Sequence, residues 1–320
     1  MKKIKDKLYG EFEIEDILYE IIQSKTIQRL KNIHQGGASF LINKNWNVTR
    51  YEHSIGVMLL LRILNTSIEQ QILGLIHDIS HTAFSHVSDL VFEHKNEDYH
   101  EKIFDFVFDN SDVKTILKKH NINIKSLLKL ESKTLEYDLP ALCADRVDYT
   151  LRDMYACNNI DSKFIKEFID SLVLKENIIC INSIQKSKEF LNLYCKEVID
   201  YFMNEKNIYA SFKLTNILKK AIKLNLITKE DFNKDDYFVL EKIKSNKELN
   251  DELNTINNDV QLEQNNINYD IHMKLKPRMI DPHTVVNNKV YKLSELDSNS
   301  KSIIERNLDI IKKGIYLKIN

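Results

Sequence analysis

Hydrophobic residues recur at helical spacing along much of this chain. The apolar residues of 17–33 approximate one face of a helix, and residues 50–64 form a strongly apolar segment that also predicts a helix. Ser67 then precedes another apolar segment with this spacing, and serine is a preferred residue at the N-terminus of a helix. These patterns predict three helices in the N-terminal part of the chain.

The same spacing continues beyond the first hundred residues. One helical pattern begins near His100, a second begins at Pro140, and the pattern stays helical from about residue 160 to residue 225. By contrast, the Gly- and Asn-rich stretch GGASFLINKNWN at residues 36–47 predicts a loop. The helical segments together predict a mainly α-helical body.

Short alternating segments at both ends of the chain predict strands. Residues 1–15 alternate weakly, which indicates a short strand or hairpin. Near the C-terminus, YDIHMKLKPRMI and VVNNKVYKL also alternate, with a turn predicted at Asn287-Asn288, and a helix then precedes the strand GIYLKIN. We therefore expect a helical catalytic domain over residues 1–225 and a small α+β appendage over residues 226–320.

Composition narrows the class of protein. The 320 residues are 43% hydrophobic and 29% charged, and only 3 Pro and 6 Gly interrupt them, which is typical of a soluble helical protein. Neither a membrane-spanning run of about 20 apolar residues nor a signal peptide is evident, so we expect a cytoplasmic location. The net charge of -1 provides no general attraction for nucleic acid.

Three polar motifs lie within apolar helical patterns, and seven of the ten histidines fall in the first third of the chain. The motifs are RYEH, HDISH and DRVDY. A divalent metal needs imidazole and carboxylate ligands that converge from rigid elements, and these motifs supply both. We predict a centre for Mn, Mg, Fe, Ni or Zn with the ligands His53, His77, Asp78 and Asp145.

Two arginines stand beside the predicted ligands. Arg50 precedes His53 by three residues and Arg146 directly follows Asp145, and their planar guanidinium groups match the geometry of phosphate oxygens. A single His-Asp pair is a weak signal, but several buried His, Asp and Arg side chains are costly unless they are paired or bind metal. The set therefore favours metal-assisted hydrolysis of a phosphorylated substrate over a helical scaffold with incidental histidines.

The order H…HD…D, carried by RYEHSIGV, LIHDISHTAFSH and ADRVDY, resembles the HD-domain phosphohydrolase superfamily. Within it the sequence is most similar to deoxynucleoside triphosphate triphosphohydrolases, including the sterile-alpha-motif-and-HD-domain enzymes. The resemblance extends to about Cys157 and is weaker beyond it, although KPRMIDPHTV is similar to a late segment of these enzymes. It implies an HD-type helical bundle that hydrolyses dNTPs, with dGTP as the suggested preference, to nucleoside and triphosphate.

The resemblance also implies catalytic roles next to the metal ligands. His81, His86 and His100 match histidines beside the substrate phosphates. Asp89 and Glu101 match the carboxylates that pair with them. Such a pairing would keep one histidine protonated, so that it could act as a general acid for the leaving group.

Five further residues match substrate-binding positions of the family. Arg50 and Arg146 correspond to phosphate-binding positions, and Tyr149 and Asp153 to positions that face the sugar. Gln35 corresponds to the residue that reads the 3′-hydroxyl. The resemblance therefore implies a nucleotide as the substrate. It also implies that the chain assembles as a homo-oligomer, because relatives form dimers, tetramers or hexamers.

Two positions depart from the family pattern. Tyr9 stands in DKLYG where the family's DPxHG has histidine. Gly36 follows Gln35 where enzymes that reject ribose carry a bulkier apolar residue, so we expect room for a 2′-hydroxyl and comparable hydrolysis of GTP and dGTP.

Two alternatives remain open at this stage. One is an HD phosphatase or phosphodiesterase acting on another nucleotide. The other is a catalytically inactive sensor that binds a nucleotide or a nucleic acid.

Overall fold

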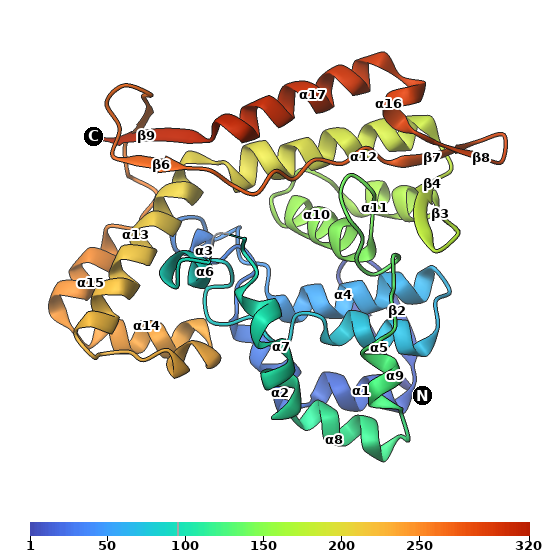
Figure 1. Ribbon diagram of the computed structural model, residues 1–320, viewed down its shortest axis with the longest axis horizontal. Coiled ribbons are helices and arrows are strands. Elements are labelled where there is room, and N and C mark those ends of the chain that lie inside the picture. Colours follow the sequence, from blue (N-terminus) through green and yellow to red (C-terminus); the bar gives the residue numbers. More distant parts are fainter. Residues whose placement is uncertain (95) are drawn as a thin grey trace.

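The computed structural model describes residues 1–94 and 96–320. Its architecture is mainly α-helical with small β-sheets, which confirms the predicted fold class (Figure 1). Helices α4 (Arg50–Ile63), α5 (Ile68–Ile76) and α10 (Ala144–Ala156) pack together and carry the predicted metal ligands or lead directly into them. These three helices set the position of the candidate site.

The N-terminal part surrounds helices α4 and α5. Its strands β1 and β2 pair antiparallel and form the hairpin predicted for residues 1–15. Apolar side chains of helices α1, α4, α5 and α8 share one buried core. The remaining elements of this part are β1 (Lys2–Asp6), β2 (Gly10–Ile14), α1 (Asp16–Gln23), α2 (Lys25–Arg29), η1 (Leu30–Asn32), α3 (Ser39–Ile42), α6 (Val87–Val91), α7 (Tyr99–Asp109), α8 (Asp112–Lys119) and α9 (Ile124–Leu127).

Local sequence explains how helices α4 and α5 begin and why they lie close together. Helix α4 starts at a capping box, in which Thr49 and Glu52 each accept a hydrogen bond from the other's backbone N–H. Helix α5 is capped by the side chain of Ser67, as predicted. At their interface, a Cβ atom on Gly74 would lie 2.5 Å from Leu61 Cδ1, so glycine permits the close approach.

The C-terminal part combines helices with two small sheets. In Figure 1, helices α12 and α17 run along one edge of the molecule, and helices α13, α14 and α15 form a lobe. The elements are α11 (Ser162–Ile169), β3 (Leu172–Lys175), β4 (Ile178–Ile181), α12 (Ile184–Lys196), the π-helix η2 (Glu197–Phe202), α13 (Glu205–Lys223), η3 (Glu230–Asn233), α14 (Asp236–Lys244), α15 (Lys247–Asn254), β5 (Leu262–Gln264), β6 (Ile271–Met273), β7 (His283–Val286), β8 (Lys289–Lys292), α16 (Leu293–Leu296), α17 (Ser298–Lys313) and β9 (Ile315–Ile319).

The sheets connect distant parts of the chain. The strand orders are β3-β4-β7-β8 and β5-β9-β6, and Ile181 of β4 pairs in parallel with Thr284 of β7. Asn287 and Asn288 have φ angles of 50° and 62°, which suits the tight hairpin turn predicted there. The four-stranded sheet therefore takes strands from both sides of residue 226, and the predicted domain boundary stays a prediction.

Four local expectations were wrong. The predicted helix over residues 17–33 is interrupted at Ser24, whose backbone is extended and whose side chain caps α2. The predicted loop at residues 36–47 contains the short helix α3. The hairpin β3–β4 interrupts the predicted helical stretch, because its short apolar runs do not distinguish strand from helix. Helix α10 begins at Ala144 rather than at Pro140.

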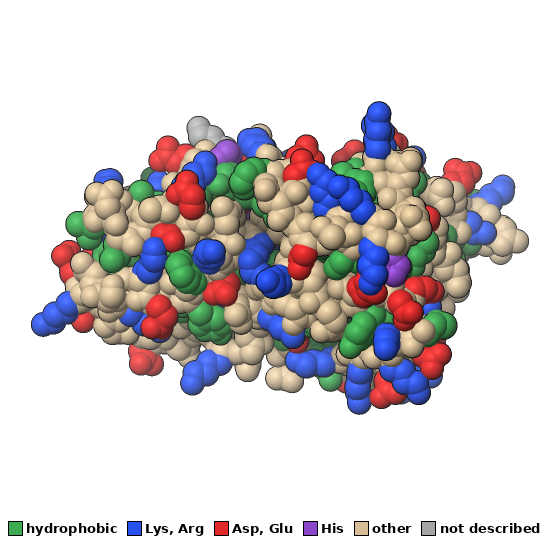
Figure 2. Space-filling model, turned by 90° about the horizontal axis from the view of Figure 1, so that it is seen from below, with side chains coloured by type: hydrophobic (Ala, Val, Ile, Leu, Met, Phe, Trp, Pro, Cys, Tyr) green, Lys and Arg blue, Asp and Glu red, His purple; other side chains and the backbone are tan. Residues whose placement is uncertain are grey.

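Two observations bear on the predicted partners. Lys and Arg side chains are interspersed with Asp and Glu over the face shown in Figure 2, as the net charge of -1 leads one to expect. Within the part of the chain that the structure describes, no helix combines the length and the apolar character needed to cross a bilayer.

Candidate active site

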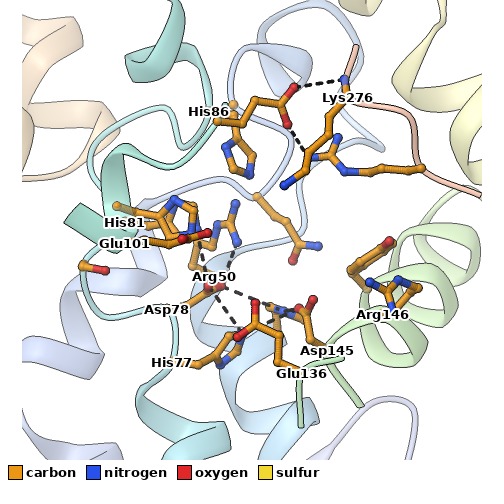
Figure 3. A pocket seen from close by; sticks show the side chains of 18 of the residues that line it. Arg50, His77, Asp78, His81, His86, Glu101, Glu136, Asp145, Arg146 and Lys276 are labelled. Atoms are coloured by element: carbon orange, nitrogen blue, oxygen red, sulfur yellow. Dashed lines mark hydrogen bonds and ion pairs between the residues drawn. The ribbon is translucent and has the colours of Figure 1, made fainter. Parts of the chain in front are cut away.

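A cavity of about 1130 Å³ lies where helices α4, α7 and α10 meet the turn after α5. Residues 128–139 and the segment that follows strand β6 complete its wall. In Figure 3, His77 and Asp145 lie at one end of this pocket, and His86 and Lys276 lie at the other. The two ends of the pocket therefore carry different groups.

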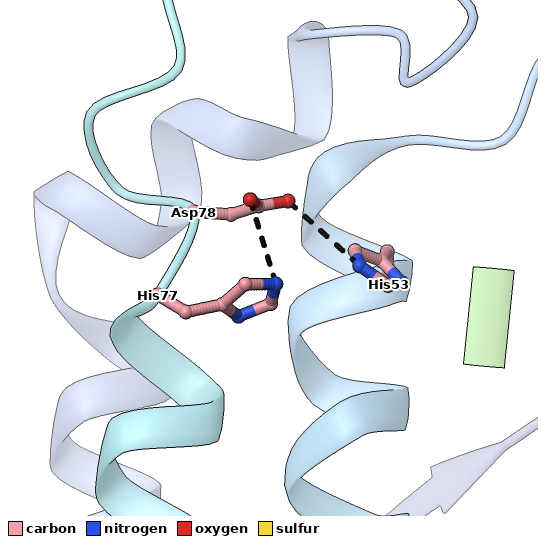
Figure 4. A group of neighbouring side chains, drawn as sticks. All are labelled: His53, His77 and Asp78. Atoms are coloured by element: carbon pink, nitrogen blue, oxygen red, sulfur yellow. Dashed lines mark ion pairs between the residues drawn. The ribbon is translucent and has the colours of Figure 1, made fainter. Parts of the chain in front are cut away.

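The four predicted metal ligands meet at the first end. His53 comes from α4, His77 follows the last residue of α5, and Asp145 lies in the first turn of α10. His53 Nε2 lies 2.9 Å from Asp145 Oδ1 and 3.9 Å from Asp78 Oδ2. His77 Nε2 lies 3.4 Å from Asp78 Oδ1 and 3.6 Å from Asp145 Oδ1. Figure 4 shows both imidazoles facing the Asp78 carboxylate.

The end of helix α5 explains how His77 and Asp78 can reach the same point. Adjacent residues within a helix would point about 100° apart around its axis. Helix α5 instead ends at Ile76, and the chain turns after it. The turn brings the carboxylate of Asp78 over the imidazole of His77, so both side chains reach the same point.

Hydrogen bonds on the far side of each ring fix which nitrogen faces the centre. His77 Nδ1 lies 2.8 Å from the carbonyl oxygen of Gly74, so it carries the proton and donates. His77 Nε2 is buried and has no hydrogen-bond partner among the described residues. His53 Nδ1 lies 2.8 Å from Asp148 Oδ2, an arrangement typical of metal-binding histidines. Both Nε2 atoms can therefore present a lone pair to a cation.

The residues fit a divalent metal. Metal–ligand bonds of about 2.0–2.2 Å place neighbouring ligand atoms about 3–3.5 Å apart, close to the separations found here. Burial alone would lower the pKa of His53, yet the carboxylates of Asp145 and Asp148 raise it to about 10. These carboxylates thus favour a positive charge at this point, which a cation would supply in place of the proton on His53 Nε2. His53, His77, Asp78 and Asp145 would hold it.

Asp148 is a functional candidate that the sequence argument passed over. Its carboxylate is fully buried, and it accepts hydrogen bonds from Arg152 at 2.9 and 3.0 Å and from the Tyr9 hydroxyl at 2.8 Å. Arg152 also pairs with Asp6 at 3.1 Å. Tyr9, which replaces the family's histidine, therefore belongs to the support of His53. The second aspartate of DRVDY was the available signal.

A row of imidazoles leads away from the ligand residues. His81 Nε2 lies 3.3 Å from Asp78 Oδ1, and its ring stacks on His100 with the centroids 3.9 Å apart. The His86 ring centroid lies 5.2 Å from that of His81, and His86 Nδ1 lies 3.0 Å from Asp89 Oδ2. The row thus begins beside Asp78 and ends at the ion pair between His86 and Asp89.

These imidazoles have unequal surroundings. Burial holds the pKa of His81 well below its usual range, and burial together with nearby His86 lowers the pKa of His100 to about 4. His86 has the buried carboxylate of Asp89 as its partner. Glu101 lines the pocket, but in the described ranges it forms no ion pair with these histidines. Of the three imidazoles, His86 therefore makes the shortest contact with a carboxylate oxygen.

The two predicted phosphate-binding arginines also differ. Arg50 is buried, lines the pocket, and donates to Asp78 Oδ2 at 2.7 Å. Arg146 lines the pocket too, but its Nη1 donates to the carbonyl oxygens of Ala141 at 2.6 Å and Tyr137 at 3.3 Å. In this conformation the guanidinium of Arg146 is largely occupied by backbone. Its role at phosphate stays a prediction.

The three predicted sugar-facing residues all line the pocket. The hydroxyl of Tyr149 lies 3.0 Å from that of Tyr194, and Gln35 Oε1 is buried without a hydrogen-bond partner among the described residues. Burial raises the pKa of Asp153 to about 7 and that of its neighbour Glu197 well above the usual range. Neither carboxyl oxygen of Glu197 accepts a hydrogen bond from an N–H or O–H group in the described part of the chain. A proton shared between Glu197 and Asp153 would give each carboxyl group a hydrogen-bond partner.

Gly36 has a structural explanation other than an enlarged sugar pocket. A Cβ atom at this position would lie 2.2 Å from Ser39 Oγ and 2.3 Å from the Tyr201 hydroxyl, and these two groups lie 3.2 Å apart. Tyr201 belongs to η2, and π-helices often occur at functional sites. The space that a side chain would need is therefore already filled by Ser39 and Tyr201.

The sequence argument also missed cationic groups from the C-terminal part. Lys274, Lys276 and Arg278 line the pocket, more than 100 residues from the HD motifs. The segment KPRMIDPHTV was noted only for its similarity to a late part of the family. Glu136, beside His77 and Asp145 in Figure 3, was missed as well.

Comparison with known proteins gives the chain's relatives. Residues 50–153 match the family model described as HD domain. The chain is 44% identical over 321 residues to the uncharacterized protein YdhJ of Bacillus subtilis, and this match covers 99% of each of the two chains. It is 35% identical to the metal-dependent phosphohydrolase cns2 of Cordyceps militaris, over 53% of this chain and 50% of that protein.

More distant relatives extend the comparison. The deoxynucleoside triphosphate triphosphohydrolase SAMHD1 of Danio rerio is 24% identical over 53% of this chain and 30% of that protein. The crystal structure of a hypothetical protein from Aquifex aeolicus has the same fold, with a TM-score of 0.72 at 19% identity, and the match covers 96% of this chain and 99% of that one.

Proposed function

Because the chain belongs to the HD-domain phosphohydrolase superfamily, we propose that it is a metal-dependent hydrolase of nucleoside or deoxynucleoside triphosphates that releases nucleoside and triphosphate. One observation carries the proposal. The group formed by His53, His77, Asp78 and Asp145 opens into the row of histidines that ends at the ion pair of His86 with Asp89. Such a row suits a substrate with several phosphate groups.

The chain's own residues divide the work between them. A bound divalent cation would supply Lewis-acid activation of a phosphoryl oxygen and of water. Arg50, fixed by Asp78, would place a positive charge beside the substrate phosphates. Release of the nucleoside leaves an oxygen that needs a proton, and His86 with its Asp89 partner would donate it.

The nucleoside would occupy the wall formed by Gln35, Tyr149 and Asp153. The unpartnered Gln35 Oε1 can accept a hydrogen bond from a sugar hydroxyl. Since Ser39 and Tyr201 fill the space beside Gly36, the missing side chain alone is no reason to expect acceptance of ribose. Selectivity for deoxyribose is therefore compatible with this pocket.

A second candidate is an HD phosphatase that releases orthophosphate from a nucleotide. The carboxylate of Glu97, which forms an ion pair with Arg278, favours it, because the carboxylate takes up room at the end of the pocket opposite His77. A substrate with one phosphate group would leave this ion pair intact.

Product analysis separates the two candidates. Metal-supplemented protein is incubated with each NTP, dNTP and nucleoside monophosphate, and the products are resolved by ion-exchange chromatography. A His77→Ala variant measures contaminating phosphatases. Nucleoside plus triphosphate supports the proposal, whereas orthophosphate or pyrophosphate as the product contradicts it. Rates for dGTP and GTP from the same runs report the sugar preference.

A further inference from the structure

The segment between strands β6 and β7 forms the part of the pocket wall that is remote from the predicted metal ligands. Lys274, Lys276 and Arg278 of this segment line the cavity. In Figure 3, Lys276 lies near His86 and away from His77. Three cationic side chains from the C-terminal part thus border the same cavity as the HD motifs.

At this point a carboxylate of the chain itself is held as an anionic ligand would be. Glu97 accepts hydrogen bonds from the guanidinium of Arg278 and, at 3.4 Å, from the backbone N–H of Lys276. The side chains of Glu97 and Arg278 are 19% and 25% exposed, so the pair is partly shielded from water. A guanidinium and a backbone N–H are also the groups that bind phosphate oxygens in proteins.

The local backbone and the neighbouring ring add to this picture. Glu97 has a φ angle of 55°, in the left-handed region that non-glycine residues seldom adopt. The guanidinium of Arg278 lies over the ring of Phe202, 5.8 Å from its centroid, which holds it at the pocket wall. The guanidinium of Arg278 therefore packs on the ring of Phe202 and donates to the carboxylate of Glu97.

The position is continuous with the row of histidines. His86 and Glu97 both line this cavity, and in Figure 3 His86 lies near Lys276, whose backbone N–H donates to Glu97. His86 neighbours His81, and His81 contacts Asp78. A chain of phosphate groups whose first member lies between the predicted metal ligands and His86 would extend from there toward Arg278.

We propose that Arg278 and the Lys276 N–H form a subsite for the terminal phosphate groups of the substrate, and that Glu97 occupies it until a phosphate displaces the carboxylate. This inference rests on the proposed function and names the part of the pocket that selects long phosphate chains. A polyphosphate has to displace Glu97, whereas orthophosphate bound at the predicted metal ligands does not.

The test is anion binding to the metal-loaded protein, measured by isothermal titration calorimetry with inorganic tripolyphosphate and orthophosphate as probes. The variants are Arg278→Gln and Glu97→Gln. The matched controls are Arg62→Gln and Glu15→Gln, since Arg62 and Glu15 form an ion pair of 2.7 Å outside the residues that line the pocket. No turnover is needed, so failure of the subsite and failure of the proposed reaction can be told apart.

Arg278→Gln is expected to weaken tripolyphosphate binding about tenfold, because a charge-assisted pair is lost. Glu97→Gln is expected to strengthen it about threefold or more, because the competing carboxylate loses its charge and the side chain keeps its shape. Orthophosphate binding should change less than about twofold in both variants.

Three results would overturn the subsite. The first is unchanged or weaker tripolyphosphate binding in Glu97→Gln. The second is an equal effect of Arg278→Gln on both anions. The third is the absence of tripolyphosphate binding to both the unmodified protein and Glu97→Gln.

Discussion

The two ends of the pocket are built in different ways. At the end with His53 and His77, the side chains come from helices or their termini, and a second layer of hydrogen bonds fixes each ring. At the other end, Lys276 and Arg278 come from an extended segment, and their main contact is with Glu97, which a ligand would replace. The comparison indicates a preorganised centre for the chemistry and a more adaptable wall for substrate choice.

The largest effect is expected from Asp145→Asn at the preorganised end. Asp145 Oδ1 lies 2.9 Å from His53 Nε2 and 3.6 Å from His77 Nε2, so loss of this carboxylate should lower kcat/KM about 1000-fold, or about 4 kcal/mol of transition-state stabilisation. Steady-state rates on the substrate found by product analysis measure it. Asp109→Asn, at an exposed ion pair with Lys114, is the control and should retain full activity.

Asp148→Asn tests whether the second layer matters. This side chain orients His53 without being one of the four predicted ligands, so metal affinity should fall about 10- to 100-fold. The change also weakens the partner of buried Arg152, which should reduce the free energy of unfolding by about 3 kcal/mol. Metal competition titrations and urea unfolding measure the two effects. Unchanged metal affinity would show that His53 needs no such support.

The carboxyl pair behind the sugar-facing wall should make stability depend on pH. Burial raises the pKa of Asp153 to about 7 and that of Glu197 well above its usual range, so between about pH 4 and pH 7 these two groups bind more protons in the folded state than in the unfolded state. The contribution of this pair to the free energy of unfolding is therefore fully present below about pH 4 and is lost as the pH rises through about 7. Glu197→Gln should reduce this loss by about 1–2 kcal/mol between pH 5 and 8.

Urea unfolding of the unmodified protein and Glu197→Gln at several pH values measures this difference. Taking the difference between the two proteins cancels the titration of the remaining groups. Identical pH slopes would mean that Glu197 and Asp153 do not share a proton in the folded state.

The smallest effect is expected from Tyr9→Phe. The variant loses one hydrogen bond to Asp148 Oδ1, an atom that Arg152 still contacts at 2.9 Å. The free energy of unfolding should fall by about 1 kcal/mol, and metal affinity should change by less than about threefold. Urea unfolding against Tyr19→Phe as a control checks this. A loss of metal affinity as large as that in Asp148→Asn would show that Tyr9 supports His53 as much as Asp148 does.

The sequence predicted those parts of the structure that depend on residues within one short segment. A strongly apolar run identified helix α4, and the turn residues Asn287 and Asn288 identified the C-terminal hairpin. The four predicted ligands came from three short motifs, and the fold brings the two imidazoles within 2.9–3.9 Å of the two carboxylates. Their function as ligands stays a prediction.

What the sequence did not predict depends on contacts between distant segments. Arg278 lies 181 residues from Glu97, and neither residue belongs to a sequence motif that predicts this ion pair. Likewise, the filling of the space beside Gly36 by Tyr201 depends on how η2 packs against α3. The strands β3 and β4 were missed because their apolar runs are too short to show a period.

Metal reconstitution tests the central claim most directly. Protein is stripped with a chelator, its metal content is measured by mass spectrometry, and its hydrolytic activity is followed as Mn, Mg, Fe, Ni or Zn is returned. We predict loss of activity on stripping, recovery with a bound divalent metal, and neither binding nor recovery in Asp145→Asn. Full activity in the stripped protein, or recovery in Asp145→Asn, would contradict the assignment of this centre.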